Sequence, residues 1–253
     1  MKIDTDRVRA VALKELREYR RRRSIVVAMI ILPLVFLIQP TLDVFLAPRG
    51  YSLQLPLLLL LLIPVITPST LAAYSVVGER EQGTLEPLLT TPLRREEFIL
   101  GKAAAVMLPT LVLSYGVFGI FLLVVRLFAS TAAVSNVFHQ SSVLVAVGLL
   151  TPLMAGWAVV VGLAVSVRAN EVRVAQQLGM LASFPPLGAV VLLGIGVITP
   201  SIRVAIIFAV ALLVIDIRAV RLVARMFDRE RLVTGVRATR AGASRRRWWA
   251  PTE

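Results

Sequence analysis

Six long apolar runs restrict what this sequence can fold into. Each holds about 20–25 residues, the length that a helix needs to cross the hydrocarbon core of a bilayer. Only helices and closed barrels satisfy every backbone hydrogen bond in hydrocarbon, and barrel strands alternate apolar and polar residues. Residues 55–62 contain no polar side chain, so the sequence predicts an all-α integral membrane protein. The predicted spans are residues 25–46, 53–77, 103–125, 143–167, 177–198 and 202–223.

The basic residues predict which ends of the spans face the cytoplasm. The formal net charge is +13, yet 57% of the residues are hydrophobic, too many for a soluble nucleic-acid-binding protein. Of the 28 Lys and Arg residues, only Arg49, Arg126 and Arg203 lie in or directly beside the loops after spans one, three and five. The positive-inside rule therefore places both termini in the cytoplasm, as an even number of spans requires. We expect a multi-pass protein of the plasma (inner) membrane that binds lipid and no nucleic acid.

The sequence contains few of the residues that form catalytic and metal-binding sites. The sequence has no cysteine and one histidine, His139, which excludes thiol catalysis, disulfides and multi-histidine metal sites. A phosphate-binding loop needs a glycine five residues before its Gly-Lys pair and a hydroxyl residue after it. The one Gly-Lys pair, Gly101-Lys102, has Glu96 and Ala103 at those positions. We therefore expect no enzyme activity, no catalytic residue and no bound cofactor or metal in this chain.

The two ends of the chain are predicted to lie on the membrane surface. Residues 1–24 form an N-terminal segment with a helix over residues 4–23, and an apolar stripe follows one face of it. Such a helix can lie in the headgroup plane, although a simple topology-setting charge cluster is the alternative. A six-helix membrane domain over residues 25–224 follows, and residues 225–253 form a basic tail expected to meet anionic lipid. The stripe consists of Val8, Val11, Ala12, Leu16 and Tyr19.

The segment between spans two and three, residues 78–102, is predicted to fold into short helices. Gly83 is suited to end the helix that continues from span two, and Thr84 to cap a new short helix. That short helix must end before Pro92, because the residue before a proline avoids the α region. Thr91 and Pro92 are in turn a suitable start for the next helix.

The predicted short helix presents a docking surface. Leu85, Leu88 and Leu89 share one face at helical spacing, which is typical of a contact with another surface. Glu79, Glu81 and Glu86 surround them with negative charge. The alternative is a helical turn packed on its own protein.

This segment resembles the signature of the ABC type-2 exporter permeases. In that family the stretch follows the second of six spans and forms the coupling region that sits in a cleft of the ATPase subunit. The resemblance implies the permease subunit of an ATP-driven exporter, joined to two separate ATPase subunits that bind ATP and Mg²⁺ and to a second permease copy, identical or related. The three leucines would then be the packed contacts, and the glutamates would pair with the ATPase or orient the N-terminal helix. The coupling residues carried over are Glu79, Arg80, Glu81, Gly83, Thr84, Leu85, Glu86, Leu88, Leu89 and Pro92.

The predicted spans four and six contain two further features. Ala158, Gly162 and Ser166 recur every four residues, as small residues do where helices approach closely, and packing within the chain is favoured over a dimer contact. Asp216 is expected near the arginine-rich end of span six, paired with an arginine or extended to the interface.

The alternatives to a permease are a lipid-modifying membrane enzyme, for which no Asp-rich metal motif is present, and a non-transporting assembly factor.

Overall fold

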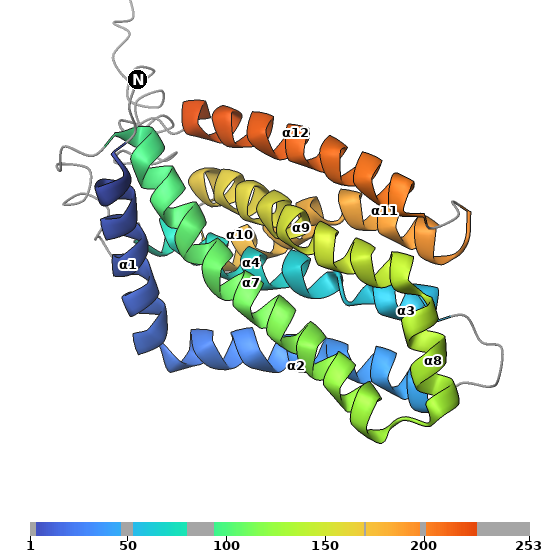
Figure 1. The fold of residues 1–253 in the computed structure, drawn as a ribbon. Coiled ribbons are helices and arrows are strands. Elements are labelled where there is room, and N and C mark those ends of the chain that lie inside the picture. The colour runs from blue at the N-terminus through green and yellow to red at the C-terminus, as the bar shows by residue number, and fades with distance from the viewer. Residues whose placement is uncertain (1–3, 47–52, 80–93, 170, 198–200, 227–253) are drawn as a thin grey trace, which may run out of the picture.

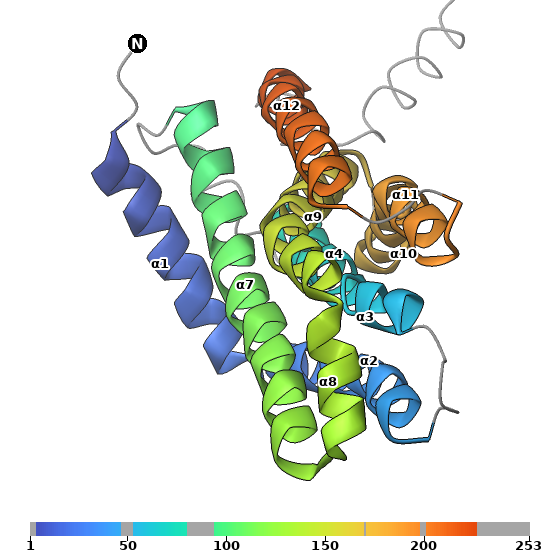
Figure 2. The ribbon, with the colours of Figure 1, turned by 45° about the vertical axis from the view of Figure 1, so that its right-hand side comes forward.

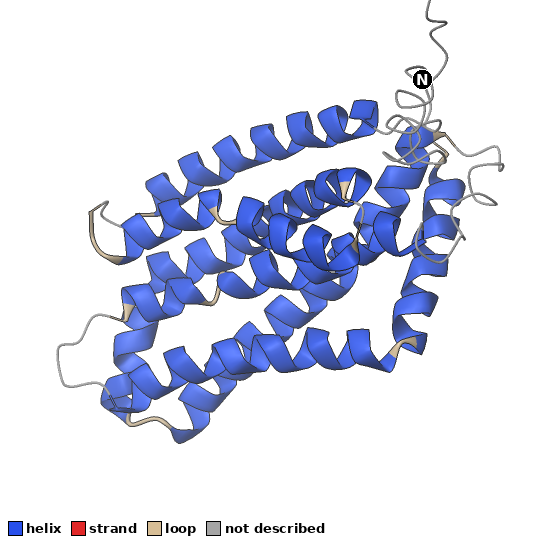
Figure 3. Cartoon of the chain, turned by 180° about the vertical axis from the view of Figure 1, so that it is seen from behind, coloured by secondary structure: helices blue, strands red, loops and turns tan. Residues whose placement is uncertain are grey.

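The computed structural model describes residues 4–46, 53–79, 94–169, 171–197 and 201–226. These residues form helices, with no strand among them, as the sequence predicts (Figure 3). The elements in chain order are α1 (Thr5–Arg21), α2 (Arg23–Leu46), α3 (Gln54–Leu59), α4 (Leu62–Ala73), the π-helical turn η1 (Tyr74–Gly78), α7 (Arg95–Phe128), α8 (Thr131–His139), α9 (Ser141–Arg168), α10 (Val172–Ser183), α11 (Pro185–Gly194) and α12 (Ile202–Met226).

Length and composition identify the helices able to cross a membrane. Within the described ranges, three qualify: α2 over Met29–Leu46, α7 over Glu96–Phe128 and α9 over Ser141–Arg168. The pair α10 and α11, bent by 41° at its break, qualifies as a fourth if it is one span. The chain is therefore a multi-pass membrane protein with three or four clear spans. Helix α12 has 25 residues, but Arg203, Asp216, Arg218 and Arg221 leave it no stretch of 18 residues with fewer than three charges.

The second predicted span, residues 53–77, is interrupted in the structure, because α3 ends at Leu59 and α4 begins at Leu62. Pro64 has no N–H to donate to the carbonyl of Leu60, and its ring crowds that carbonyl. The chain tightens just before it: the amides of Leu60 and Leu61 donate to carbonyls only three residues back, at 3.2 and 3.0 Å. The π-helical turn η1 then carries the chain to Glu79.

Helix α9 is the centre of the bundle. It packs against α4, α10, α12 and α7 (Figures 1 and 2). One buried apolar cluster, around Leu57, Phe121 and Leu150, fills the end of the bundle near α3 and α8. A second, around Leu71, Val106 and Val160, fills the other end and takes in the apolar stripe of α1.

Helix α1 crosses the end of the bundle and packs along the beginning of α7 (Figures 1 and 2). Val11 and Tyr19 of its apolar face are buried against protein. Large side chains on α2 and α7 instead point outward, such as Ile31 and Val112, as expected for surfaces that face lipid. The stripe that the sequence marks as membrane-facing is thus used largely for packing against α7 and its neighbours.

The start of α7 differs from the expectation. Pro92 was predicted at the first helical position, but Arg94 is still extended and the helix begins at Arg95. The reason is Glu97, whose carboxylate accepts a hydrogen bond from the Arg94 amide at 3.1 Å. This is the acidic half of a capping box, in which the side chain at the third helical position binds the backbone amide of the N-cap residue and so fixes where the helix starts.

Candidate functional site at the base of the 80–93 loop

A buried lysine organises the junction of α1, η1 and α7. Lys102 lies about two turns into α7, and its side chain is 1% exposed. Its Nζ lies 2.9 Å from Glu15 Oε1 and 2.9 Å from Glu79 Oε2, and it donates to the Ser75 carbonyl. The ammonium also stands 4.9 Å from the centre of the Phe98 ring, within cation–π range. A buried charge needs such partners because its desolvation is costly.

The charges at this junction balance. Two carboxylates, Glu15 and Glu79, face two amines, Lys102 and Lys14. Both carboxylates are buried, whereas the Lys14 side chain is 45% exposed at the rim and donates to Glu79 Oε1 at 2.8 Å. We call these four residues the ion cluster.

The environment shifts the pKa values of three members of the ion cluster, and not all in the same direction. Burial raises the pKa of the Glu15 carboxyl, and the charge of Lys102 offsets only part of that effect. Burial acts the same way on Glu79, but Lys102 and Lys14 outweigh it and hold the pKa of that carboxyl below its ordinary value. Burial opposes the charge of Lys14, yet the hydrogen bond and charge of Glu79 raise the pKa of that amine overall. Glu79 is therefore the firmly ionised acid of the pair at neutral pH.

A second contact joins the first turn of α1 to the start of α7. Glu97 is almost fully buried, and besides capping α7 it accepts a hydrogen bond from the Asp4 amide at 3.2 Å. Arg7 lies 3.7 Å from the same carboxylate. The negative charge also suits the helix N-terminus at which it lies.

These two contacts hold both ends of one loop. Glu79 is the last described residue before residues 80–93, and Arg94 is the first after them. Helix α1 binds Glu79 through Lys14 and binds Glu97 through Asp4, two points about 15 Å apart along the helix. Any displacement of the loop's two ends relative to each other must therefore strain α1 or break one of these contacts.

The structure places one of the predicted coupling residues, Glu79, in this arrangement. Glu15, Glu97 and Lys102 were not predicted as site residues. Glu15 carries a signal that could have been used, because it lies on the apolar stripe, four residues from both Val11 and Tyr19. The other predicted coupling residues lie outside the described residues: Arg80, Glu81, Gly83, Thr84, Leu85, Glu86, Leu88, Leu89 and Pro92.

Comparison with known proteins identifies the family. The model of a family described as ABC-2 family transporter protein matches residues 15–185, which include residues 80–93 and three of the four residues of the ion cluster, Glu15, Glu79 and Lys102. The chain belongs to the ABC-2 transporter family. It is thus a membrane component of a transport system. No curated protein matches the sequence significantly.

In this ABC-2 family chain the small residues of α9 contact other helices of the same chain. Ala158, Gly162 and Ser166 are all buried. A Cβ placed on Gly179 of α10 would lie 3.6 Å from the Cα of Gly162, so the two backbones approach closely. Ser166 Oγ accepts hydrogen bonds from the amides of Val76 and Val77, at 3.3 and 3.2 Å, and so supports η1 just before the loop.

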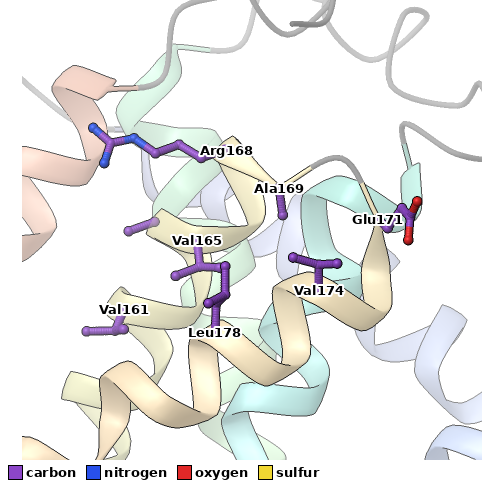
Figure 4. Close-up of a pocket in the computed structure, with 8 residues that line it drawn as sticks. Val161, Val165, Arg168, Ala169, Glu171, Val174 and Leu178 are labelled. Atoms are coloured by element: carbon purple, nitrogen blue, oxygen red, sulfur yellow. The ribbon is translucent and has the colours of Figure 1, made fainter.

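An open groove of about 530 Å³ lies along α9 and α10 at the same end of the bundle (Figure 4). Its lining is mainly aliphatic, including Val161, Val165 and Leu178. Arg168 and Glu171 border it and point away from each other (Figure 4). In the part of the chain that the structure describes, no three His, Asp or Glu side chains gather where they could hold a metal ion.

Proposed function

We propose that this chain is the permease subunit of an ATP-driven exporter, and that residues 80–93 dock into separate ATPase subunits. The family match supports a permease, and the resemblance of residues 78–102 to the coupling region of exporter permeases supports the docking role. Two ATPases would bind ATP and Mg²⁺, and a second permease copy, identical or related, would complete the transporter. The complex would lie in the inner membrane with both termini of this chain in the cytoplasm.

The contacts of α1 with both ends of the loop are the observation that carries the coupling part of this proposal. A docking loop transmits force only if its ends are attached to something stiff. Here one end is attached through the ion cluster and the other through Glu97, and both attachments lead to α1 and α7. Motion of the ATPases would therefore reach α1 and the long helix α7 together.

The role of the ATPase partner is tested by co-purification of the tagged full-length chain from its native membranes. We expect an ABC ATPase to purify with it, and we expect the double variant Leu88→Ala/Leu89→Ala to lose most of that ATPase. Thr90→Ala, in the same loop, is the matched control and should retain it. Both variants must reach the membrane in wild-type amounts for the comparison to count.

Two outcomes would contradict the proposal at different points. Purification of the wild-type chain with no ATPase would overturn the assignment as an ABC permease subunit. An ATPase retained equally by wild type and by Leu88→Ala/Leu89→Ala would leave that assignment standing and remove the leucines from the interface.

A further inference from the structure

Asp216 lies deeper in the bundle than the sequence suggests. Its side chain turns toward α9, and a Cβ placed on Gly156 would be only 2.9 Å from Asp216 Oδ2. Gly156 is near the middle of α9, far from either end of the bundle. Asp216 is 8% exposed, so the expected extension toward the interface is wrong.

The carboxyl group of Asp216 has no cationic partner among the described residues. Its Oδ1 is buried without a hydrogen-bond partner, and no ion pair joins the carboxyl group to a described side chain. The expected pairing with an arginine is therefore also not found there. Because Gly156 has no side chain, there is room for the carboxyl group at this position.

The charged and titratable groups on the neighbouring helices lie elsewhere. The one charged residue of α9, Arg168, is about 18 Å along the helix from Gly156. On α12, Arg218 and Arg221 are two and five residues on, so they point to other faces than Asp216. On α7 the charges lie near its ends, and the mid-helix phenol of Tyr115 donates to the Gly148 carbonyl at 2.8 Å. Those α7 charges are Arg95, Glu96, Glu97, Lys102 and Arg126.

We propose that Asp216 is a proton-binding site within the bundle. An isolated carboxylate is far more costly to bury than a neutral carboxylic acid, and a membrane-embedded bundle offers no water to compensate. The carboxyl group therefore carries a proton while α9 and α12 are packed. It releases that proton to water when the contact between the two helices opens.

This site makes the packing of α12 on α9 sensitive to pH. The ionised form is favoured only in the open arrangement, so raising the pH shifts the equilibrium toward opening. A proton taken up from water on closing accompanies the reverse step. The site does not depend on the identity of the transported substrate or on the ATPase partner.

Infrared spectroscopy of the full-length protein in lipid tests the site directly. At neutral pH we expect the carbonyl band of a protonated carboxyl group in the wild type and its loss in Asp216→Asn. Asp43→Asn on α2 is the matched control and should leave the band of the Asp216 carboxyl group in place. Identical spectra for wild type and Asp216→Asn would overturn the proposal.

A second pair of variants keeps Asp216 in place and serves if Asp216→Asn does not fold. Gly156→Ala pushes a methyl group toward Oδ2 and should shift the carboxyl band, whereas Gly148→Ala on the same helix meets nothing within 4 Å and should not. No shift in Gly156→Ala would count against the geometry. A carboxylate band that appears only when sodium, potassium or guanidinium ions are added would show a cation site instead and would also overturn the proposal.

Discussion

At the scale of single residues, the junction of α1 and α7 depends on whether Lys102 is paired. We expect Lys102→Met to lower the free energy of unfolding by about 3–5 kcal/mol, because it leaves Glu15 and Glu79 buried together with one partly exposed cation. Lys14→Met is the matched control: its side chain is 45% exposed, so the loss should be about 1 kcal/mol or less. Denaturation of the purified protein in mild detergent measures both.

The same experiment separates a missing charge from a missing side chain. Adding Glu15→Gln to Lys102→Met removes the surplus negative charge and should recover part of the lost stability. A loss in Lys102→Met no larger than that in Lys14→Met would mean that the lysine is not in a desolvated cluster.

Of the ion cluster, the sequence predicts only Glu79 as a site residue, and it does not show which residues pair with one another. Lys102 is 87 residues from Glu15 and 27 from Ser75, and nothing local links them. Glu15 can be singled out because an acid on an apolar stripe needs a buried partner. Which base supplies it follows only from the way α1 lies across α7, and that depends on packing over the whole end of the bundle.

At the scale of helices, hydropathy predicts where the long helices lie, and prolines predict where helices break. The long runs predict α2, α7 and α9 well, since an apolar stretch of this length has no other stable form in a bilayer. Prolines break the hydrogen-bond ladder of a helix, and the chain does break before Pro64 and at Pro185. The extent of each break depends on whether neighbours can satisfy the released groups, as Ser166 does for η1, and sequence alone does not supply that information.

The contact between α1 and α7 makes a prediction about one glycine. A Cβ on Gly101 would lie 2.6 Å from Val11 Cβ and 3.0 Å from the Val8 carbonyl oxygen, so Gly101→Ala must push α1 away. We expect a loss of about 1–3 kcal/mol from this overpacking and faster amide hydrogen exchange throughout α1.

Gly116→Ala, on the same helix, is the matched control for Gly101→Ala. A Cβ at Gly116 meets nothing within 4 Å, and alanine favours a helix interior by roughly 0.5–1 kcal/mol. Gly116→Ala should therefore be neutral or stabilising and leave exchange in α1 unchanged. Equal behaviour of the two variants would contradict the close approach of α1 to α7.

At the scale of the whole molecule, the positive-inside pattern and the helix arrangement agree. The start of α7 and the ends of α9 and α12 gather at the end of the bundle where α1 lies (Figure 1). Together with α1, those segments carry a large share of the basic residues, among them Arg95, Lys102, Arg168, Arg218 and Arg221. The six-span topology requires three crossings besides α2, α7 and α9: the broken helix α3–α4, the bent pair α10–α11, and α12, which carries several charges.

Single cysteines decide this topology, and the cysteine-free sequence allows them to be introduced directly. If the broken helix α3–α4 crosses the membrane, Ser135→Cys on α8 is outside and Glu171→Cys, before α10, is inside. A membrane-impermeant maleimide should then label Ser135→Cys in intact cells and label Glu171→Cys only after permeabilisation. If α3–α4 does not cross, α7 begins outside and the two results are exchanged.

Ser201→Cys and Thr252→Cys test α12 in the same way: a crossing puts them on opposite sides, with Thr252→Cys protected in intact cells, and equal labelling would remove the sixth span.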